Sequence, residues 1–183
     1  MTLLILGVAL WWAAHLFKRV APQMRAGLGD KGRGMVAGAL FLSIILMVLG
    51  YRSANGAIYW GRETGLIEVT HLLMIFAFYL FAASGAKGAK IWLGTKLRHP
   101  MLTGVVAWSV GHLLVNGDTE SFVLFGGMGL WALVQMVVIN AAEGPWQAPP
   151  RAPARKEIIA VVITLVVTAV VVGIHSLLGV TPW

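Results

Sequence analysis

The sequence predicts an all-α fold, a polytopic helical bundle in a membrane, and three observations lead to this prediction. Hydrophobic residues make up 58% of the 183 residues and charged residues only 11%, whereas charged residues account for about a quarter of a soluble domain. Apolar runs of about 20 residues, the length that crosses a bilayer core, recur along the chain. Because hydrocarbon offers the backbone no hydrogen-bonding partner, each run is expected to form a helix.

We predict about six transmembrane helices in a single integral membrane domain that covers residues 1–183. In chain order the predicted spans are Leu3–Phe17, Met35–Tyr51, Leu66–Ala83, Met101–Val115, Phe122–Ile139 and Ile158–Leu178. The basic residues Lys18 and Arg19 follow the first span, whereas a cleavable signal peptide carries its basic residues in front of the apolar run. Four prolines mark residues 143–153 as an extended linker before the last span.

The distribution of basic residues predicts the orientation of the spans. Twelve of the fourteen lie in the first, third and fifth loops, whereas the second and fourth loops hold only Arg52 and Arg62. Lys and Arg concentrate in the cytoplasmic loops of membrane proteins, so both termini are expected to face away from the cytoplasm. The same loops account for the formal net charge of +7 without a nucleic-acid partner, for which the sequence carries no motif.

The ionisable residues inside the spans restrict the chemistry to histidine. Cysteine is absent, which excludes disulfides, cysteine-ligated haem or iron–sulfur clusters, and cysteine nucleophiles. No Asp, Glu, Lys or Arg lies at the centre of a span, which argues against carboxylate proton relays and carboxylate-bridged metal pairs. A single buried histidine is most simply explained by a hydrogen bond to neighbouring backbone. Four apolar helices each contain one, and together they predict a functional site: His15, His71, His112 and His175.

Depth in the membrane sorts these histidines. At a rise of about 1.5 Å per residue, His71, His112 and His175 share a layer roughly 5–8 Å below the outer ends of their spans. His15 and His99 lie on the inner side, where a second site is conceivable. Two histidines bind a haem iron from opposite faces of the porphyrin, so matched depth favours His71 with His112 as the axial ligands of a haem.

The fourth span has a surface that suits a flat macrocycle. Gly104, Trp108 and Gly111 fall on one helix face with His112. Two glycines remove bulk beside the histidine, and an indole can stack on a porphyrin or flank its edge. Ordinary packing between helices explains the same spacing and remains the alternative.

Three further patterns predict packing and boundaries. Gly34 and Gly38 form a GxxxG pair that favours close approach of another helix. Asp118 or Thr119 is expected to cap the start of the fifth span. Five tryptophans are expected to form interfacial belts: Trp11, Trp12, Trp60, Trp92 and Trp183.

Several stretches of the sequence resemble the NnrU family of bacterial membrane proteins. The most specific is the run from Arg98, RHPMLTGVVAWSVGHLLVNGDTESFVLFGG, and the others are HLFKRVAPQMR from His15, LSIILMVLGYR and the terminal LLGVTPW. The resemblance covers nearly the whole chain. It implies a multi-pass protein of the bacterial inner membrane, linked to nitrite and nitric oxide reduction in denitrification through electron transfer or redox sensing.

The sequence is also distantly similar to zeta-carotene isomerase, which contains haem b. This similarity implies a non-covalent haem b with axial ligands at His15 and His112. The cysteine suggested there as an alternative ligand falls at Ser109, a departure that puts ligand-switching isomerisation in doubt. The second ligand beside His112 therefore stays open between His71 and His15.

These resemblances leave three functions open. The first is a haem b protein that serves redox chemistry of nitrogen oxides. The second is a haem-dependent isomerase of a polyene or carotenoid-like lipid, and the third is a cofactor-free accessory or assembly subunit of a respiratory complex.

The element RHPM, at residues 98–101, is similar to a motif of membrane methyltransferases that use S-adenosylmethionine. Those enzymes close a further polar C-terminal segment over the cofactor, and none follows the fourth span here. We therefore interpret Arg98 and His99 as the interfacial start of a helix with Pro100 in its first turn.

Overall fold

The computed structural model describes residues 1–85 and 88–180, and helices dominate it. The longer helices are α1 (Thr2–Val20), α3 (Lys31–Arg52), α4 (Thr64–Gly85), α5 (Pro100–Val115), α7 (Gly127–Glu143) and α8 (Ala154–Leu177). The short elements are α2 (Pro22–Gly27), β1 (Ile58–Trp60), the 3-10 helix η1 (Trp92–Thr95), β2 (Gly117–Asp118), α6 (Thr119–Ser121) and the π-helical η2 (Phe122–Gly126). The predicted all-α fold class is confirmed.

Five helical segments of the described chain are long and apolar enough to cross a membrane. They are Thr2–Val20, Lys31–Arg52, Thr64–Gly85, Thr119–Glu143 and Ala154–Leu177. The predicted fourth span corresponds to α5, which is apolar but has only 16 residues. At 1.5 Å per residue it extends about 24 Å, which is shorter than a hydrocarbon core of about 30 Å. The predicted fourth span therefore matches α5, which is shorter than these five segments.

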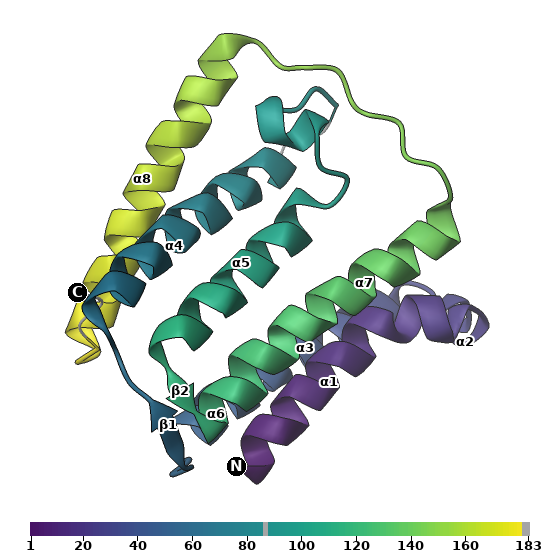
Figure 1. Cartoon of the computed structure of the whole chain (residues 1–183). Coiled ribbons are helices and arrows are strands. Elements are labelled where there is room, and N and C mark those ends of the chain that lie inside the picture. The colour runs from purple at the N-terminus through teal and green to yellow at the C-terminus, as the bar shows by residue number, and fades with distance from the viewer. Residues whose placement is uncertain (86–87, 181–183) are drawn as a thin grey trace.

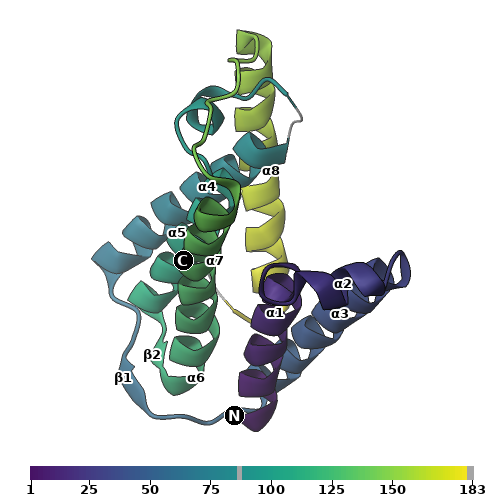
Figure 2. The ribbon, with the colours of Figure 1, turned by 90° about the vertical axis from the view of Figure 1, so that its right-hand side faces the viewer.

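The helices lie side by side in the order α3, α1, α7, α5, α4 and α8 (Figure 1). A view turned by 90° places α4, α5 and α7 toward one side and α3 toward the other, so the row of helices is curved (Figure 2). The largest buried cluster joins α1, α3 and α7 and consists of Leu4, Val8, Met47, Met128, Trp131 and Ala132. Helix α7 therefore lies between α1 and α5 and packs against both.

Small residues bring neighbouring helices close together. A Cβ atom on Gly50 of α3 would lie 2.2 Å from the backbone nitrogen of Leu4, so α1 and α3 touch backbone to backbone. The predicted GxxxG pair does not take part, because a Cβ on Gly34 or Gly38 would meet no described atom within 4 Å. These two glycines lie on a face of α3 that no described helix of the chain covers.

The loops gather at opposite ends of the molecule. At the end that holds the N-terminus, β1 pairs antiparallel with β2 (Figure 1), and the Asp118 side chain accepts a hydrogen bond of 2.7 Å from the Ser121 N–H. This confirms the predicted cap. At the other end, the Lys90 N–H donates to the Pro150 carbonyl over 2.9 Å, which joins two of the basic loops.

Candidate functional site

Three of the four histidines in the apolar helices share one hydrogen-bonding arrangement. In each, Nδ1 lies within hydrogen-bonding distance of the carbonyl oxygen four residues earlier: His15 to Trp11 at 3.0 Å, His112 to Trp108 at 2.9 Å and His175 to Val171 at 2.8 Å. A carbonyl only accepts, so Nδ1 carries the proton, and Nε2 of the neutral ring keeps its lone pair. A metal-ligating histidine usually shows this arrangement, with its other ring nitrogen donating to a fixed acceptor.

His15 lies in an aromatic group at the contact between α1 and α7. Its ring centroid is 4.3 Å from that of Trp11 and 4.6 Å from that of Trp131. The two indoles meet edge to face at 5.4 Å. His15 therefore faces the interior of the bundle between two aromatic rings.

His112 lies in a second aromatic group, formed by α5 and η2. Its ring stacks on Phe125 at a centroid distance of 4.4 Å and an angle of 22°. Trp108 lies 5.0 Å from His112 and 4.9 Å from Phe125. Because Phe125 and Trp131 both belong to the segment Thr119–Glu143, the two histidines flank the same membrane helix from α1 and α5.

The other two histidines lie on α4 and α8. Thr70 Oγ1 donates a hydrogen bond of 2.9 Å to the Gly111 carbonyl, which places the next residues, His71 and His112, at one level on adjacent helices. The shared level expected for His71 and His112 therefore agrees with the contact between α4 and α5.

The residues of the predicted flat surface on α5 contact two different elements, α4 and η2. A Cβ on Gly104 would lie 2.6 Å from Phe81, and a Cβ on Gly111 would lie 2.6 Å from Met74, so side chains of α4 fill the space beside both glycines. Trp108 points toward Phe125, as its ring contact shows. The structure therefore brings Trp108 to His112 and uses the two glycines for close packing against α4.

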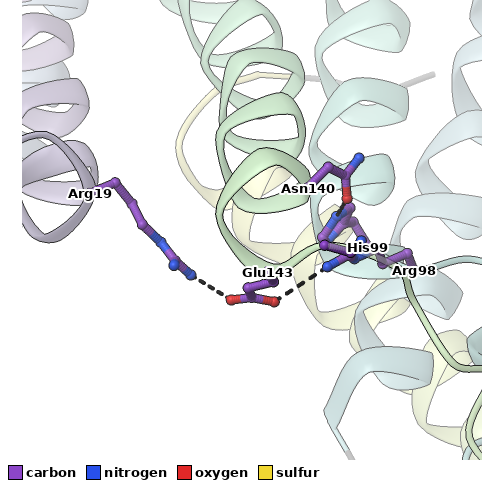
Figure 3. Close-up of polar contacts among 6 residues, drawn as sticks. Arg19, Arg98, His99, Asn140 and Glu143 are labelled. Carbon is purple, nitrogen blue, oxygen red and sulfur yellow. Dashed lines mark hydrogen bonds and ion pairs between the residues drawn. The ribbon is translucent and has the colours of Figure 1, made fainter.

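A polar group closes the end of the bundle where the basic loops gather (Figure 3). The carboxylate of Glu143 on α7 accepts from Arg19 of α1 over 2.5 Å and lies 3.6 Å from Arg98. Arg98 also donates to the Gly144 carbonyl over 2.6 Å, and His99 hydrogen-bonds Asn140 over 2.8 Å. These contacts tie α1, α5 and α7 together, and Pro100 occupies the first turn of α5 as predicted.

Sequence reasoning missed a set of buried polar atoms on α1, α5 and α7. In the part of the chain that the structure describes, four such atoms near α1, α5 and α7 have no hydrogen-bond partner: Trp11 Nε1, Ser109 Oγ, Trp131 Nε1 and Gln135 Oε1. Trp11 and Trp12 were expected at an interface, but both lie midway along α1 and pack against the core. Trp183 lies outside the described residues. The usable signal was the spacing of Trp11 and His15, four residues apart on one helix face.

The fold and the site define a polytopic α-helical membrane protein in which three histidines of the apolar helices hydrogen-bond the backbone through Nδ1. Within residues 1–85 and 88–180, no three His, Asp or Glu side chains gather in a way that could hold a bare metal ion. The chain belongs to the NnrU family: the family model described as NnrU protein matches residues 3–182, which confirms the resemblance seen in the sequence. Comparisons with curated proteins and with solved structures give no match.

Proposed function

We propose that this NnrU-family protein binds one haem b between α1 and α5, with His112 and His15 as its axial ligands. The haem serves electron transfer or redox sensing linked to nitrite and nitric oxide reduction in a bacterial inner membrane. In this proposal both termini face the periplasm, because the basic loops lie at the opposite end from the N-terminus.

The observation that carries the proposal is the protonation state imposed on the two imidazoles. The carbonyls of Trp11 and Trp108 accept from Nδ1 and leave the Nε2 lone pairs of His15 and His112 available. Neutral imidazole with a hydrogen-bonded second nitrogen is a normal axial ligand of haem. The donor set of the chain therefore fits haem b.

The choice of His15 over His71 rests on the similarity to zeta-carotene isomerase and on the direct bond between α4 and α5. Two axial ligands lie on opposite faces of a porphyrin, so the helices that carry them must stand apart. The Thr70–Gly111 hydrogen bond joins α4 directly to α5 beside His71, and a porphyrin there would have to separate these helices. Helix α7 lies between α1 and α5, so α7 would have to move aside to admit a porphyrin held by His15 and His112.

Bound haem would supply one-electron redox chemistry within the membrane. The chain's own residues hold the two imidazoles in one tautomer and surround them with rings: Trp11 and Trp131 at His15, and Trp108 and Phe125 at His112. The apolar helices keep water away from both. At the end with the basic loops, the Glu143 carboxylate lies 2.5 Å from Arg19 and 3.6 Å from Arg98. These ion pairs link α1, α7 and the start of α5.

An absorption spectrum of the purified protein, before and after dithionite, tests the proposal. We expect a Soret band and the spectrum of a low-spin bis-histidine haem, with the band lost or shifted to that of a five-coordinate haem in His112→Ala and in His15→Ala. His175→Ala is the matched control, since His175 also lies in an apolar helix and is also bonded at Nδ1. A colourless wild-type protein reconstituted with haem b would contradict the proposal, and loss of the band in His71→Ala alone would replace His15 by His71.

A further inference from the structure

Unpartnered polar atoms lie beside His15 at the contact between α1 and α7. Trp131 is only 5% exposed, yet its indole N–H has no partner in the described chain. Trp11 Nε1 is likewise buried and unpartnered, and its ring touches that of Trp131. Buried polar groups are nearly always hydrogen-bonded, so several orphans in one place indicate a partner from outside the chain.

One more orphaned atom extends this group on α7. Gln135 lies one turn beyond Trp131, so its unpartnered Oε1 belongs to the same part of the helix. Ser109 does not belong to the group, because Ser109 lies against Gly129 on the side of α7 that faces α5, whereas Trp131 contacts α1. The group therefore offers two N–H donors and one carbonyl acceptor.

Neighbouring tryptophans show that the missing partners are particular to this place. Trp12 follows Trp11 directly, and its indole N–H donates to the Gly127 carbonyl over 3.1 Å. The indole of Trp60 donates to the Leu113 carbonyl over 3.0 Å. The fold thus supplies acceptors to other indoles and leaves the pair Trp11 and Trp131 without one.

The surroundings restrict the chemistry of the missing partner. Trp11 lies midway along α1, and residues 2–17, 100–115 and 127–142 of the three helices contain no Asp, Glu, Lys or Arg. A charged ligand would find no counter-charge on these helices, so the partner is uncharged. The missing partner is therefore a lipid-soluble molecule with an oxygen that accepts hydrogen bonds from two indoles. It must also fit beside the aromatic rings of His15, Trp11 and Trp131.

We propose that Trp11 and Trp131 bind the ring carbonyl of a membrane quinone through their indole N–H groups. Gln135 Oε1 is placed to accept from a hydroxyl of the reduced form, the quinol. The evidence for quinone binding is the set of unpartnered polar atoms, and it does not depend on the haem. Its role as the electron partner rests on the proposed function, because the bound ring would lie beside the proposed haem ligand His15.

Equilibrium binding of a short-chain benzoquinone to the full-length protein in lipid nanodiscs tests this inference. Trp11→Phe and Trp131→Phe should each weaken binding about five- to tenfold, the usual effect of losing one hydrogen bond. Trp12→Phe removes the same atoms from the next residue, whose N–H is already satisfied, and should change binding less than about twofold. An alkylbenzene with the same side chain but no ring oxygens should bind at least about tenfold more weakly.

Five outcomes decide between the proposals. Equal effects of Trp11→Phe and Trp12→Phe, equal binding of the alkylbenzene, or no quinone binding by the wild type would each overturn the quinone site. Recording the Soret band on the same samples separates the two proposals. Quinone binding with the expected variant pattern in a protein that never takes up haem would leave the quinone site standing and refute the haem. A shifted Soret band in the tryptophan variants, with quinone binding unchanged, would assign the indoles to the haem and refute the quinone site.

Discussion

Thr70 donates its hydroxyl proton to the carbonyl oxygen of Gly111 across the contact between α4 and α5, at a distance of 2.9 Å. The same hydroxyl lies 2.8 Å from the carbonyl of Leu66 in its own helix. Gly111 has no side chain to hold the helices apart, and its carbonyl gains a second donor. This bond fixes the register of α4 on α5 and thereby the level of His71 relative to His112.

Removing this bond should loosen the contact between α4 and α5. Thr70→Val keeps the shape of the side chain and should destabilise the protein by about 0.5–1.5 kcal/mol, the range measured for hydrogen bonds between membrane helices. Thermal unfolding in detergent measures the change. Thr168→Val is the control, since Thr168 bonds only the Thr164 carbonyl in its own helix, and an equal loss there would contradict the prediction.

Glycine at the α4–α5 contact should be indispensable, and glycine on the open face of α3 should not be. Gly104→Leu would drive a side chain into Phe81 and should cost about 1–3 kcal/mol, the usual penalty for overpacking. Gly38→Leu meets no described atom and should leave the unfolding temperature nearly unchanged. Comparable losses in both variants would show that glycine acts through helix flexibility instead of space.

The cap at Asp118 should stabilise the segment that begins at Thr119. Asp118→Ala removes the oxygen that accepts from the Ser121 N–H and should cost about 1 kcal/mol, as for other N-caps. Asp118→Asn retains an accepting oxygen and should restore most of that loss. Unfolding curves of the three proteins make the comparison, and an asparagine variant no better than alanine would assign the effect to charge.

The ion pairs of Glu143 should stabilise the contact between α1, α5 and α7 to an extent that depends on salt concentration. Glu143→Gln removes the charge that pairs with Arg19 and Arg98, and we expect a small drop in unfolding temperature at low salt that disappears at high salt. Glu157→Gln serves as a comparison on α8, where Glu157 accepts from the Trp92 N–H and from the Tyr79 hydroxyl. A drop that persists unchanged at high salt would mean that shape, and not charge, matters at Glu143.

The absence of cysteine from the sequence allows a direct test of orientation. A single cysteine at the exposed position of Asn55 should react with a membrane-impermeant maleimide added to intact cells with a permeabilised outer membrane. A single cysteine at the exposed Ala148 in the linker should react only after the inner membrane is broken. The reverse pattern would invert the proposed topology.

The sequence by itself determined the membrane class, the helical fold and the family. Hydrocarbon leaves an apolar span no choice but a helix, and the span boundaries followed from composition to within a few residues. The cap at Asp118 and the start of α5 at Pro100 were also predictable, because both depend on hydrogen bonds or dihedral angles within a few residues of the chain.

Only the tertiary structure decided which helix faces meet, and therefore which histidines can act together. Periodicity places Gly104, Gly111 and His112 near one another on α5, but it cannot reveal that α4 fills the space beside the glycines. Depth along a span says nothing of lateral distance, so the partner of His112 could not be chosen from the sequence. The sequence gives no reason to distinguish Trp11 from Trp12. Packing places an acceptor beside the indole N–H of Trp12 and none beside that of Trp11 in the described chain.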